Sequence, residues 1–159
     1  MINRKDIWRL AASILVCQLA GIAGAVFTVN AIPSWYASLN KPAFSPPNWV
    51  FSPVWTTLYL LMGIALFMVW REGLKTRGVK PALRWFGFQL VLNSMWSFVF
   101  FGMRNPIAAF IELVLLWFAI LFTMKSFNRV SVTAAYLLMP YFLWVTFALA
   151  LNLGIVIVN

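Results

Sequence analysis

Five long apolar stretches divide the chain. Apolar runs, uncharged except for Glu112 in the fourth, cover residues of about 10–31, 50–70, 85–103, 105–124 and 130–157, and Arg/Lys clusters or Gly and Pro residues separate them. Each run is long enough for a bilayer-spanning α-helix, which needs about 20 apolar residues. The last run is longer than one crossing requires, and we expect Pro140 to kink it. The pattern predicts an all-α membrane protein, a five-transmembrane-helix bundle that forms one domain over residues 1–159.

The basic residues fall almost entirely on one side of such a bundle. The N-terminal segment and the connections after the second and fourth runs carry ten of them: Arg4, Lys5, Arg9, Arg71, Lys75, Arg77, Lys80, Arg84, Lys125 and Arg129. The other two connections carry only Lys41 and Arg104. The positive-inside rule then predicts a cytoplasmic N-terminus and a C-terminus outside. This topology accounts for the net charge of +9 without a nucleic-acid partner.

Composition removes most conventional reaction chemistry. The chain has no histidine, a single cysteine (Cys17) and only three acidic residues, Asp6, Glu72 and Glu112. Metal sites, thiolate clusters and paired-carboxylate catalysis all lack the residues that they need. We therefore expect no metal and no resident cofactor. Any chemistry must come from aromatic rings, from a bound ligand or from light.

The connection between the first two runs is unusual for a loop. The stretch "SWYASLNKPAFSPPNWVFSPVW" (34–55) is rich in aromatic residues and proline but carries one charge, Lys41. Pro42, Pro46 and Pro47 argue against helix and strand, whereas ordinary loops are polar and mobile. We interpret residues 32–49 as a stiff lid on the outer side of the membrane.

Polar and aromatic residues share helix faces in three of the runs. Gln89, Asn93, Trp96, Ser97 and Phe100 fall on one face of the third run. The second run has Trp55 and Tyr59 on one stripe, and the last has Tyr141, Trp144, Ala148 and Asn152. Such stripes more often pack helices together or form interfacial belts. Their depth favours a different interpretation, a cavity for a flat apolar ligand in the outer half of the bundle, beneath the lid.

Two further features concern packing. Ser13, Cys17, Gly21 and Ala25 recur every four residues in the first run. Small residues at this spacing let helices approach closely, within the bundle by preference and between two copies as the alternative. Glu112 lies deep in the fourth run, where a carboxylate costs about 2.5–3.5 kcal/mol. We expect it to face inward and to hydrogen-bond to Ser97 or to a neighbouring amide.

Three segments resemble a known family. "WYASLNKPAFSPPNWVFSPVWTTLYLLMG", "FQLVLNSMWSFVFFG" and "PYFLWVTFALALN" are similar to the translocator protein family, also called tryptophan-rich sensory proteins or peripheral-type benzodiazepine receptors (TspO/MBR). The resemblance implies a five-helix bundle, often a homodimer, in a lipid bilayer. It also implies binding of porphyrins such as protoporphyrin IX, of sterols, and of isoquinoline carboxamide or benzodiazepine ligands. The charge pattern favours the cytoplasmic (inner) membrane, although some relatives occupy outer membranes of bacteria or mitochondria.

The resemblance also implies site residues. By motif position the ligand pocket includes Trp35, Pro42, Pro47, Trp55, Tyr59, Asn93, Trp96, Tyr141, Trp144, Phe147 and Ala148, and the helix-face pattern adds Phe100. Trp55 and Trp144 match tryptophans implicated in light-dependent porphyrin breakdown in bacterial relatives. The weak L/V-x-Y-x-K/R motif proposed for cholesterol is absent from the chain, which disfavours steroid delivery.

These features bear on four functions. The first is a binding protein for porphyrins and other lipophilic small molecules, acting as sensor, scavenger or transporter, with Asn93, Asn152, the backbone N–H groups of the loop or Lys41 as donors to the propionates. The alternative is an enzyme that degrades porphyrin with light and oxygen and uses Trp55 and Trp144 as catalytic residues. An ion-coupled transporter is disfavoured because Glu112 is the only deep acidic group. A nucleic-acid binder is excluded by the topology of the charges.

Overall fold

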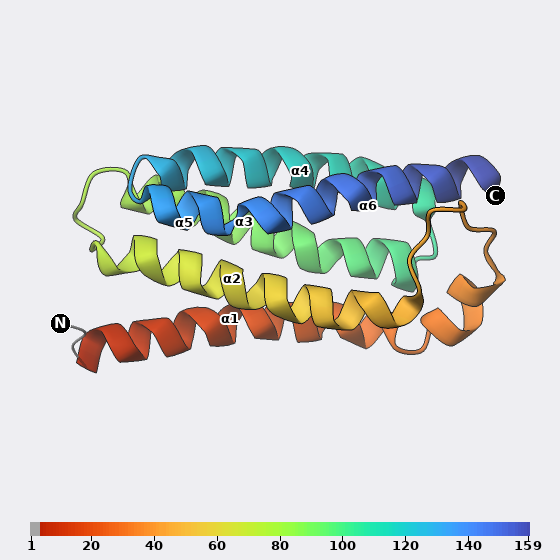
Figure 1. The fold of residues 1–159 in the computed structure, drawn as a ribbon, viewed down its shortest axis with the longest axis horizontal. Coiled ribbons are helices and arrows are strands. Elements are labelled where there is room, and N and C mark those ends of the chain that lie inside the picture. Colours follow the sequence, from red (N-terminus) through yellow and green to blue (C-terminus); the bar gives the residue numbers. More distant parts are fainter. Residues whose placement is uncertain (1–3) are drawn as a thin grey trace.

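The structure, a computed structural model, describes residues 4–159, and this part of the chain is helical without a β-strand (Figure 1). The long helices are α1 (Arg4–Thr28), α2 (Phe51–Arg71), α3 (Val79–Ser97), α4 (Pro106–Asn128) and α6 (Met139–Val158). The short α5 (Val132–Leu137) precedes α6, and three single turns, η1 (Ile32–Tyr36), η2 (Asn48–Val50) and η3 (Phe98–Gly102), lie between the long helices. The two ends of the chain lie at opposite ends of the bundle, called here its N-terminal and C-terminal ends (Figure 1).

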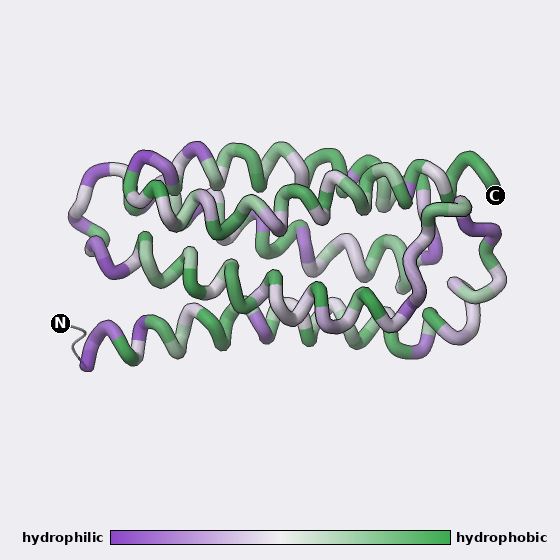
Figure 2. The backbone as a smooth tube through the Cα atoms, viewed as in Figure 1, coloured by the Kyte–Doolittle hydropathy of each residue, from purple (hydrophilic) through white to green (hydrophobic). Residues whose placement is uncertain are grey.

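Most of the long helices are long enough and apolar enough to cross a membrane. Four helical segments of the described chain could cross a bilayer by these criteria: Arg4–Thr28, Asn48–Arg71, Pro106–Asn128 and Val132–Val158. Hydrophilic residues gather at the N-terminal end, where α2 connects to α3 and α4 to α5 (Figure 2). The prediction of an all-α membrane protein is confirmed. The third predicted span, 85–103, is not among the four candidates, because α3 begins with Lys80 and Arg84 and carries Gln89 and Asn93 further along.

The last predicted run is interrupted as expected, and the interruption lies just before Pro140. The chain turns at Leu138, whose N–H donates to the carbonyl of Ala135 over 3.2 Å, and α6 starts afresh at Met139. Pro140 lies in the first turn of α6. A proline has no N–H to donate and its ring clashes with the carbonyl four residues earlier, so the helix is interrupted on the N-terminal side of the proline.

The first half of the predicted lid is not a loop. Ile32–Tyr36 forms a π-helical turn, and Pro33 is accepted there because the first turn of a helix needs no N–H from it. The second half agrees with the prediction, since Pro42, Pro46 and Pro47 lie outside helices. We call residues 32–49 the cover segment.

Hydrogen bonds join the cover segment to the last residue of the chain. The N–H of Asn40 donates to Oδ1 of Asn159 (3.0 Å), and Nδ2 of Asn159 donates back to the carbonyl of Asn40 (2.9 Å). Two residues further, the ring of Pro42 packs so closely on Gly154 of α6 that a Cβ on Gly154 would lie 2.9 Å from it. The cover segment is therefore fixed to the end of α6.

Small residues bring α1 against α2. A Cβ on Gly63 would lie 2.7 Å from Cα of Ile14, and one on Gly21 would lie 2.5 Å from the ring of Tyr59. Ser13 and Cys17 are buried on the same side of α1. The interpretation of this small-residue pattern as packing within the bundle is confirmed for Ser13, Cys17 and Gly21. It is wrong for Ala25, which is exposed one turn beyond the contact.

The contact at Gly63 gives a first prediction. We expect Gly63→Ala to lower the free energy of unfolding by about 1–3 kcal/mol, because the added methyl group meets the backbone of α1 and the helices must separate. Unfolding by dodecyl sulfate in mixed micelles would measure the change. Gly87→Ala in α3 is the matched control, since a Cβ there meets nothing within 4 Å. Equal losses in the two variants would contradict close packing as the cause.

Candidate functional site

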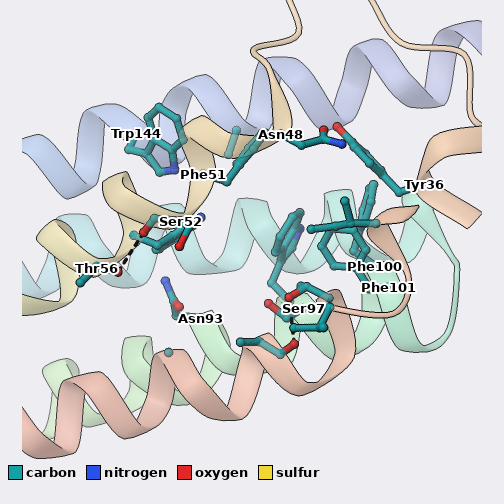
Figure 3. A pocket seen from close by; sticks show the side chains of 18 of the residues that line it. Tyr36, Asn48, Phe51, Ser52, Thr56, Asn93, Ser97, Phe100, Phe101 and Trp144 are labelled. Atoms are coloured by element: carbon teal, nitrogen blue, oxygen red, sulfur yellow. Dashed lines mark hydrogen bonds between the residues drawn. The ribbon is translucent and has the colours of Figure 1, made fainter. Parts of the chain in front are cut away.

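A cavity of about 390 Å³ occupies the C-terminal half of the bundle, enclosed by α1, α2, α3 and α6 together with the three η turns (Figure 3). Pockets for small organic ligands have volumes of about 300–1,000 Å³. Aromatic residues dominate the lining: Tyr36, Phe51, Trp55, Tyr59, Trp96, Phe100, Phe101 and Trp144. In Figure 3, Trp144 and Phe51 lie on one side of the cavity and Asn93 on the other. The size and the rings suit a flat, apolar ligand.

The rings of the lining pack against one another rather than standing alone. Phe51 meets Trp144 edge to face with ring centroids 5.9 Å apart, so that α2 and α6 share one side of the cavity. The ring centroid of Trp55 lies 5.6 Å from that of Tyr59, which is on the next turn of α2. Edge-to-face and offset arrangements at these distances are favourable and hold the rings in defined orientations. The aromatic surface is thus largely formed before any ligand arrives.

A π-helical turn at the end of α3 adds two more rings. After Ser97 the helix widens into η3, where Phe100 and Phe101 both reach the cavity. Phe100 stacks on Trp96 with centroids 5.1 Å apart and an interplanar angle of 23°. The wider turn changes the directions of the side chains after Ser97 from those of a regular α-helix. π-turns of this kind often occur at functional sites.

A chain of buried hydrogen bonds closes the cavity toward the N-terminal end. The hydroxyl of Tyr59 donates to Oδ1 of Asn93, Nδ2 of Asn93 donates to the hydroxyl of Tyr141 (2.8 Å), and this hydroxyl donates to Oε1 of Gln89 (2.8 Å). The chain connects α2, α3 and α6. Only Tyr59 and Asn93 line the cavity. Gln89 and Tyr141 lie behind them and fix the orientation of the Asn93 amide.

Two polar groups beside the cavity are buried without a hydrogen-bond partner in the described chain. They are the indole N–H of Trp96 and the side-chain amide of Asn152, both of which belong to lining residues. Asn152 is only 2% exposed. A buried polar group that lacks a partner is destabilising by about 1–3 kcal/mol. The two groups are therefore the best candidates for polar contacts with a ligand after small side-chain adjustments.

The prediction that Glu112 hydrogen-bonds to Ser97 or to a neighbouring amide is wrong. Glu112 is buried as predicted, at 8% exposure, but neither carboxylate oxygen has a hydrogen-bond partner in the described part of the chain. Ser97 faces α1 instead, where a Cβ on Gly24 would lie 3.0 Å from its hydroxyl oxygen. Glu112 belongs to α4, which does not line the cavity. The sequence placed both residues at one depth in the membrane. It could not show that Ser97 faces α1 and not α4, the helix that carries Glu112.

Seven of the predicted site residues meet in the cavity: Trp55, Tyr59, Asn93, Trp96, Phe100, Trp144 and Ala148. They come from α2, α3, η3 and α6, which are distant in the sequence. The spacing of polar and aromatic residues along these runs was sufficient to find them, because residues three or four apart share a helix face.

Five predicted residues do not line the cavity. Trp35 packs behind Phe100 with centroids 5.5 Å apart, and Phe147 lies between Trp144 and Phe44. Pro42 packs on α6, Pro47 precedes η2, and Tyr141 belongs to the hydrogen-bond chain. These five residues support the lining instead of forming it.

Lys41 is not placed to meet a ligand in the cavity. Its Nζ donates to the carbonyl of Leu39 (3.2 Å) and lies 4.8 Å from the centroid of the Tyr36 ring. Lys41 is absent from the lining, whereas Tyr36 belongs to it. Burial raises the pKa of the Tyr36 phenol above its ordinary value, so this side chain stays uncharged at neutral pH. Lys41, which was predicted to donate to propionates, thus packs against Tyr36 and does not itself line the cavity.

The sequence reasoning missed the side of the cavity formed by α1 and the start of α2. Gln18, Gly21, Ile22 and Ala25 of α1 line it, together with Asn48, Ser52 and Thr56. The last three lie at i, i+4 and i+8, a spacing that identifies one polar helix face. This signal was available in the sequence.

Comparison with known proteins agrees with this architecture. The family model described as "TspO/MBR family" matches residues 13–158. The "Tryptophan-rich protein TspO" of Chlorobaculum tepidum is 44% identical over 98% of both chains, and that of Archaeoglobus fulgidus is 42% identical over 97% of this chain and 99% of the relative. The bovine "Translocator protein" is 40% identical over 87% of this chain and 82% of its own length. A match of this extent, together with the ring-lined cavity between membrane helices, shows that the chain belongs to the TspO/MBR family.

Proposed function

We propose that this protein binds porphyrins such as protoporphyrin IX, and other flat lipophilic molecules, in the cavity of its C-terminal half. The observation that carries the proposal is the meeting of Trp55, Trp96 and Trp144 around one cavity of about 390 Å³. A porphyrin presents two broad aromatic faces, which stack favourably on such rings. Membership in the TspO/MBR family and the name of the bovine relative support a role as sensor, scavenger or transporter.

The polar groups around the cavity suit the edge of such a ligand. Trp96 offers an N–H, and Asn152 offers both a donor and an acceptor that have no partner in the described chain. A carboxyl group, such as a porphyrin propionic acid, can pair with an amide through its C=O and O–H together. Satisfying these groups would remove a destabilising feature of the empty cavity.

We further propose that α3 is a fifth crossing and that the N-terminal end of the bundle faces the cytoplasm. α3 runs from one end of the bundle to the other, packed against α1 and α4 (Figure 1). Arg71, Lys75 and Arg129 lie at the N-terminal end, whereas Lys41 and Arg104 lie at the other. An excess of basic residues is typical of the cytoplasmic side.

A second candidate function is light-dependent porphyrin breakdown. Trp55 and Trp144, which line the cavity from α2 and α6, are oxidisable and would lie against a bound porphyrin. In this scheme the porphyrin absorbs light and dioxygen is the oxidant. The protein holds the porphyrin in place and provides the two indole side chains. We rank it second because the reactivity belongs to the porphyrin and light can destroy a bound sensitiser without turnover.

Titration tests the binding proposal. Protoporphyrin IX added in the dark to detergent-purified protein should quench tryptophan fluorescence saturably. We expect Trp55→Phe and Trp144→Phe each to weaken the affinity about 2- to 10-fold, because a smaller ring stacks less well. Trp49→Phe is the matched control, since Trp49 is 74% exposed and lies outside the lining. Quenching that never saturates, or that the control reduces equally, would reject this site.

Illumination separates binding from breakdown. If the second function holds, repeated additions of protoporphyrin IX in light and air should each yield the same discrete product, and Trp55→Phe or Trp144→Phe should slow its formation about tenfold or more. Absorbance and mass spectrometry would follow the product. Bleaching that stops after one equivalent, or that is unchanged in both variants, would mean that light merely consumes the ligand.

Labelling tests the topology. In a Cys17→Ser background, we expect Lys41→Cys and Met103→Cys to react with a membrane-impermeant maleimide from outside, and Lys75→Cys only after permeabilisation, because α2 and α3 then make two crossings between positions 41 and 103. Labelling of positions 41 and 103 from opposite sides would show that α3 does not cross. Reversal of the whole pattern would show the opposite orientation.

A further inference from the structure

The cavity is open on one side only. Among the lining residues of the described chain, six are exposed: Ile22, Ala25 and Val29, and Asn48, Ser52 and Thr56. The first three lie at the end of α1 and in the turn after it, and the other three in η2 and α2. The lining residues from α3, η3 and α6 are buried or half-buried. The two exposed rows therefore form the edges of a slot between α1 and α2.

The cover segment closes the end of the cavity. Asn40 and Asn159 exchange two hydrogen bonds, and Pro42 packs on Gly154 of α6. On the other side, the ring of Tyr36 packs on Phe100 and Phe101 of η3, with centroids 6.2 and 5.8 Å apart. Opening this end requires the separation of hydrogen bonds and rings together. Among the contacts of the six edge residues in the described chain, one hydrogen bond joins the two edges, from Gln18 to the carbonyl of Thr56 at the inner end of the slot.

The slot has a definite inner limit. Nε2 of Gln18 donates to the carbonyl of Thr56 (3.2 Å), and Gly21 lies against the ring of Tyr59. Toward the N-terminal end, Gly63 and Ile14 hold the two helices in contact. Since α1 and α2 are joined there, the slot can widen only toward the C-terminal end.

The two edges of the slot belong to segments that could cross a bilayer, and they differ in polarity. Of the six edge residues, only Val29 lies outside these segments, directly after α1. The α1 edge is aliphatic, with Ile22 61% and Val29 66% exposed. The α2 edge carries the amide of Asn48 and the hydroxyls of Ser52 and Thr56, of which the Thr56 hydroxyl donates to the carbonyl of Ser52 (2.9 Å). Polar side chains directed at acyl chains are unfavourable unless they meet polar groups. An amphiphile with an apolar body and a polar edge matches both sides.

We propose that the ligand of this site is a planar amphiphile dissolved in the adjoining leaflet and that it enters sideways through the slot between α1 and α2, while the cover segment stays closed. Its polar edge passes along Asn48, Ser52 and Thr56, and its apolar body passes along Ile22 and Ala25. This inference rests on the proposed function, since it concerns how the ligand reaches the same cavity. The bilayer is then the source of the ligand.

Binding kinetics in lipid nanodiscs test the route, with protoporphyrin IX supplied from porphyrin-loaded vesicles in the dark and tryptophan quenching as the signal. We expect Ala25→Phe to slow association by about tenfold and to slow dissociation as well, because the ring obstructs the slot, whereas a ring that merely disturbed the cavity lining would speed dissociation. Ala11→Phe, at an exposed position of α1 outside the lining, is the matched control. Ile22→Ala, which widens the slot, should accelerate association about threefold.

Asn159→Ala provides the opposing test, because it removes two of the three hydrogen bonds between the end of α6 and Asn40 and leaves only the one from Nδ2 of Asn40 to the carbonyl of Val158. Lateral entry predicts rates within about twofold of the unmodified protein. Faster association and dissociation in Asn159→Ala, with no effect of Ala25→Phe and Ile22→Ala, would overturn the slot and favour entry past the cover segment. An absence of saturable equilibrium binding in the unmodified protein would reject the proposed function itself, and this inference with it.

Discussion

The structure depends on one constraint: in apolar surroundings, polar groups have only one another as partners. Helices satisfy the backbone from within, which is why every long segment of the described chain is helical. The buried side chains obey the same rule where they can. Tyr59, Asn93, Tyr141 and Gln89 form a single chain of hydrogen bonds across α2, α3 and α6. This chain fixes the relative rotation of three helices and separates the packed half of the bundle from the hollow half.

The two halves differ because their contact residues differ in size. Toward the N-terminal end, Gly63 lets the backbone of α1 touch α2. Toward the C-terminal end, rings such as Phe51 and Trp144 brace one another across α2 and α6, and a space remains between them. The cavity is thus a consequence of which residues face inward at each depth.

Two of the exceptions to the pairing rule lie at the cavity, although others, such as Glu112, do not. Trp96 and Asn152 have buried polar atoms without a partner in the described chain, and both border the cavity. Asn48 and Ser52 are exposed on a segment apolar enough to span a membrane. In a TspO/MBR family member, such groups are consistent with a ligand that combines a broad apolar surface with a polar edge. The proposed route from the bilayer and the proposed binding site then follow the same chemistry.

The sequence by itself determined what depends on local pattern: the membrane helices, the interruption near Pro140, and the helix faces that carry Trp55, Asn93 and Trp144. These follow from periodicity along one segment, which needs no knowledge of its neighbours. Only the tertiary structure decided what depends on how segments are rotated and joined. The π-turn that brings in Phe101, the lack of a partner for Glu112, and the slot beside Ala25 are of this kind. A helix face has a direction only relative to the helices around it, and sequence spacing contains no information on that rotation.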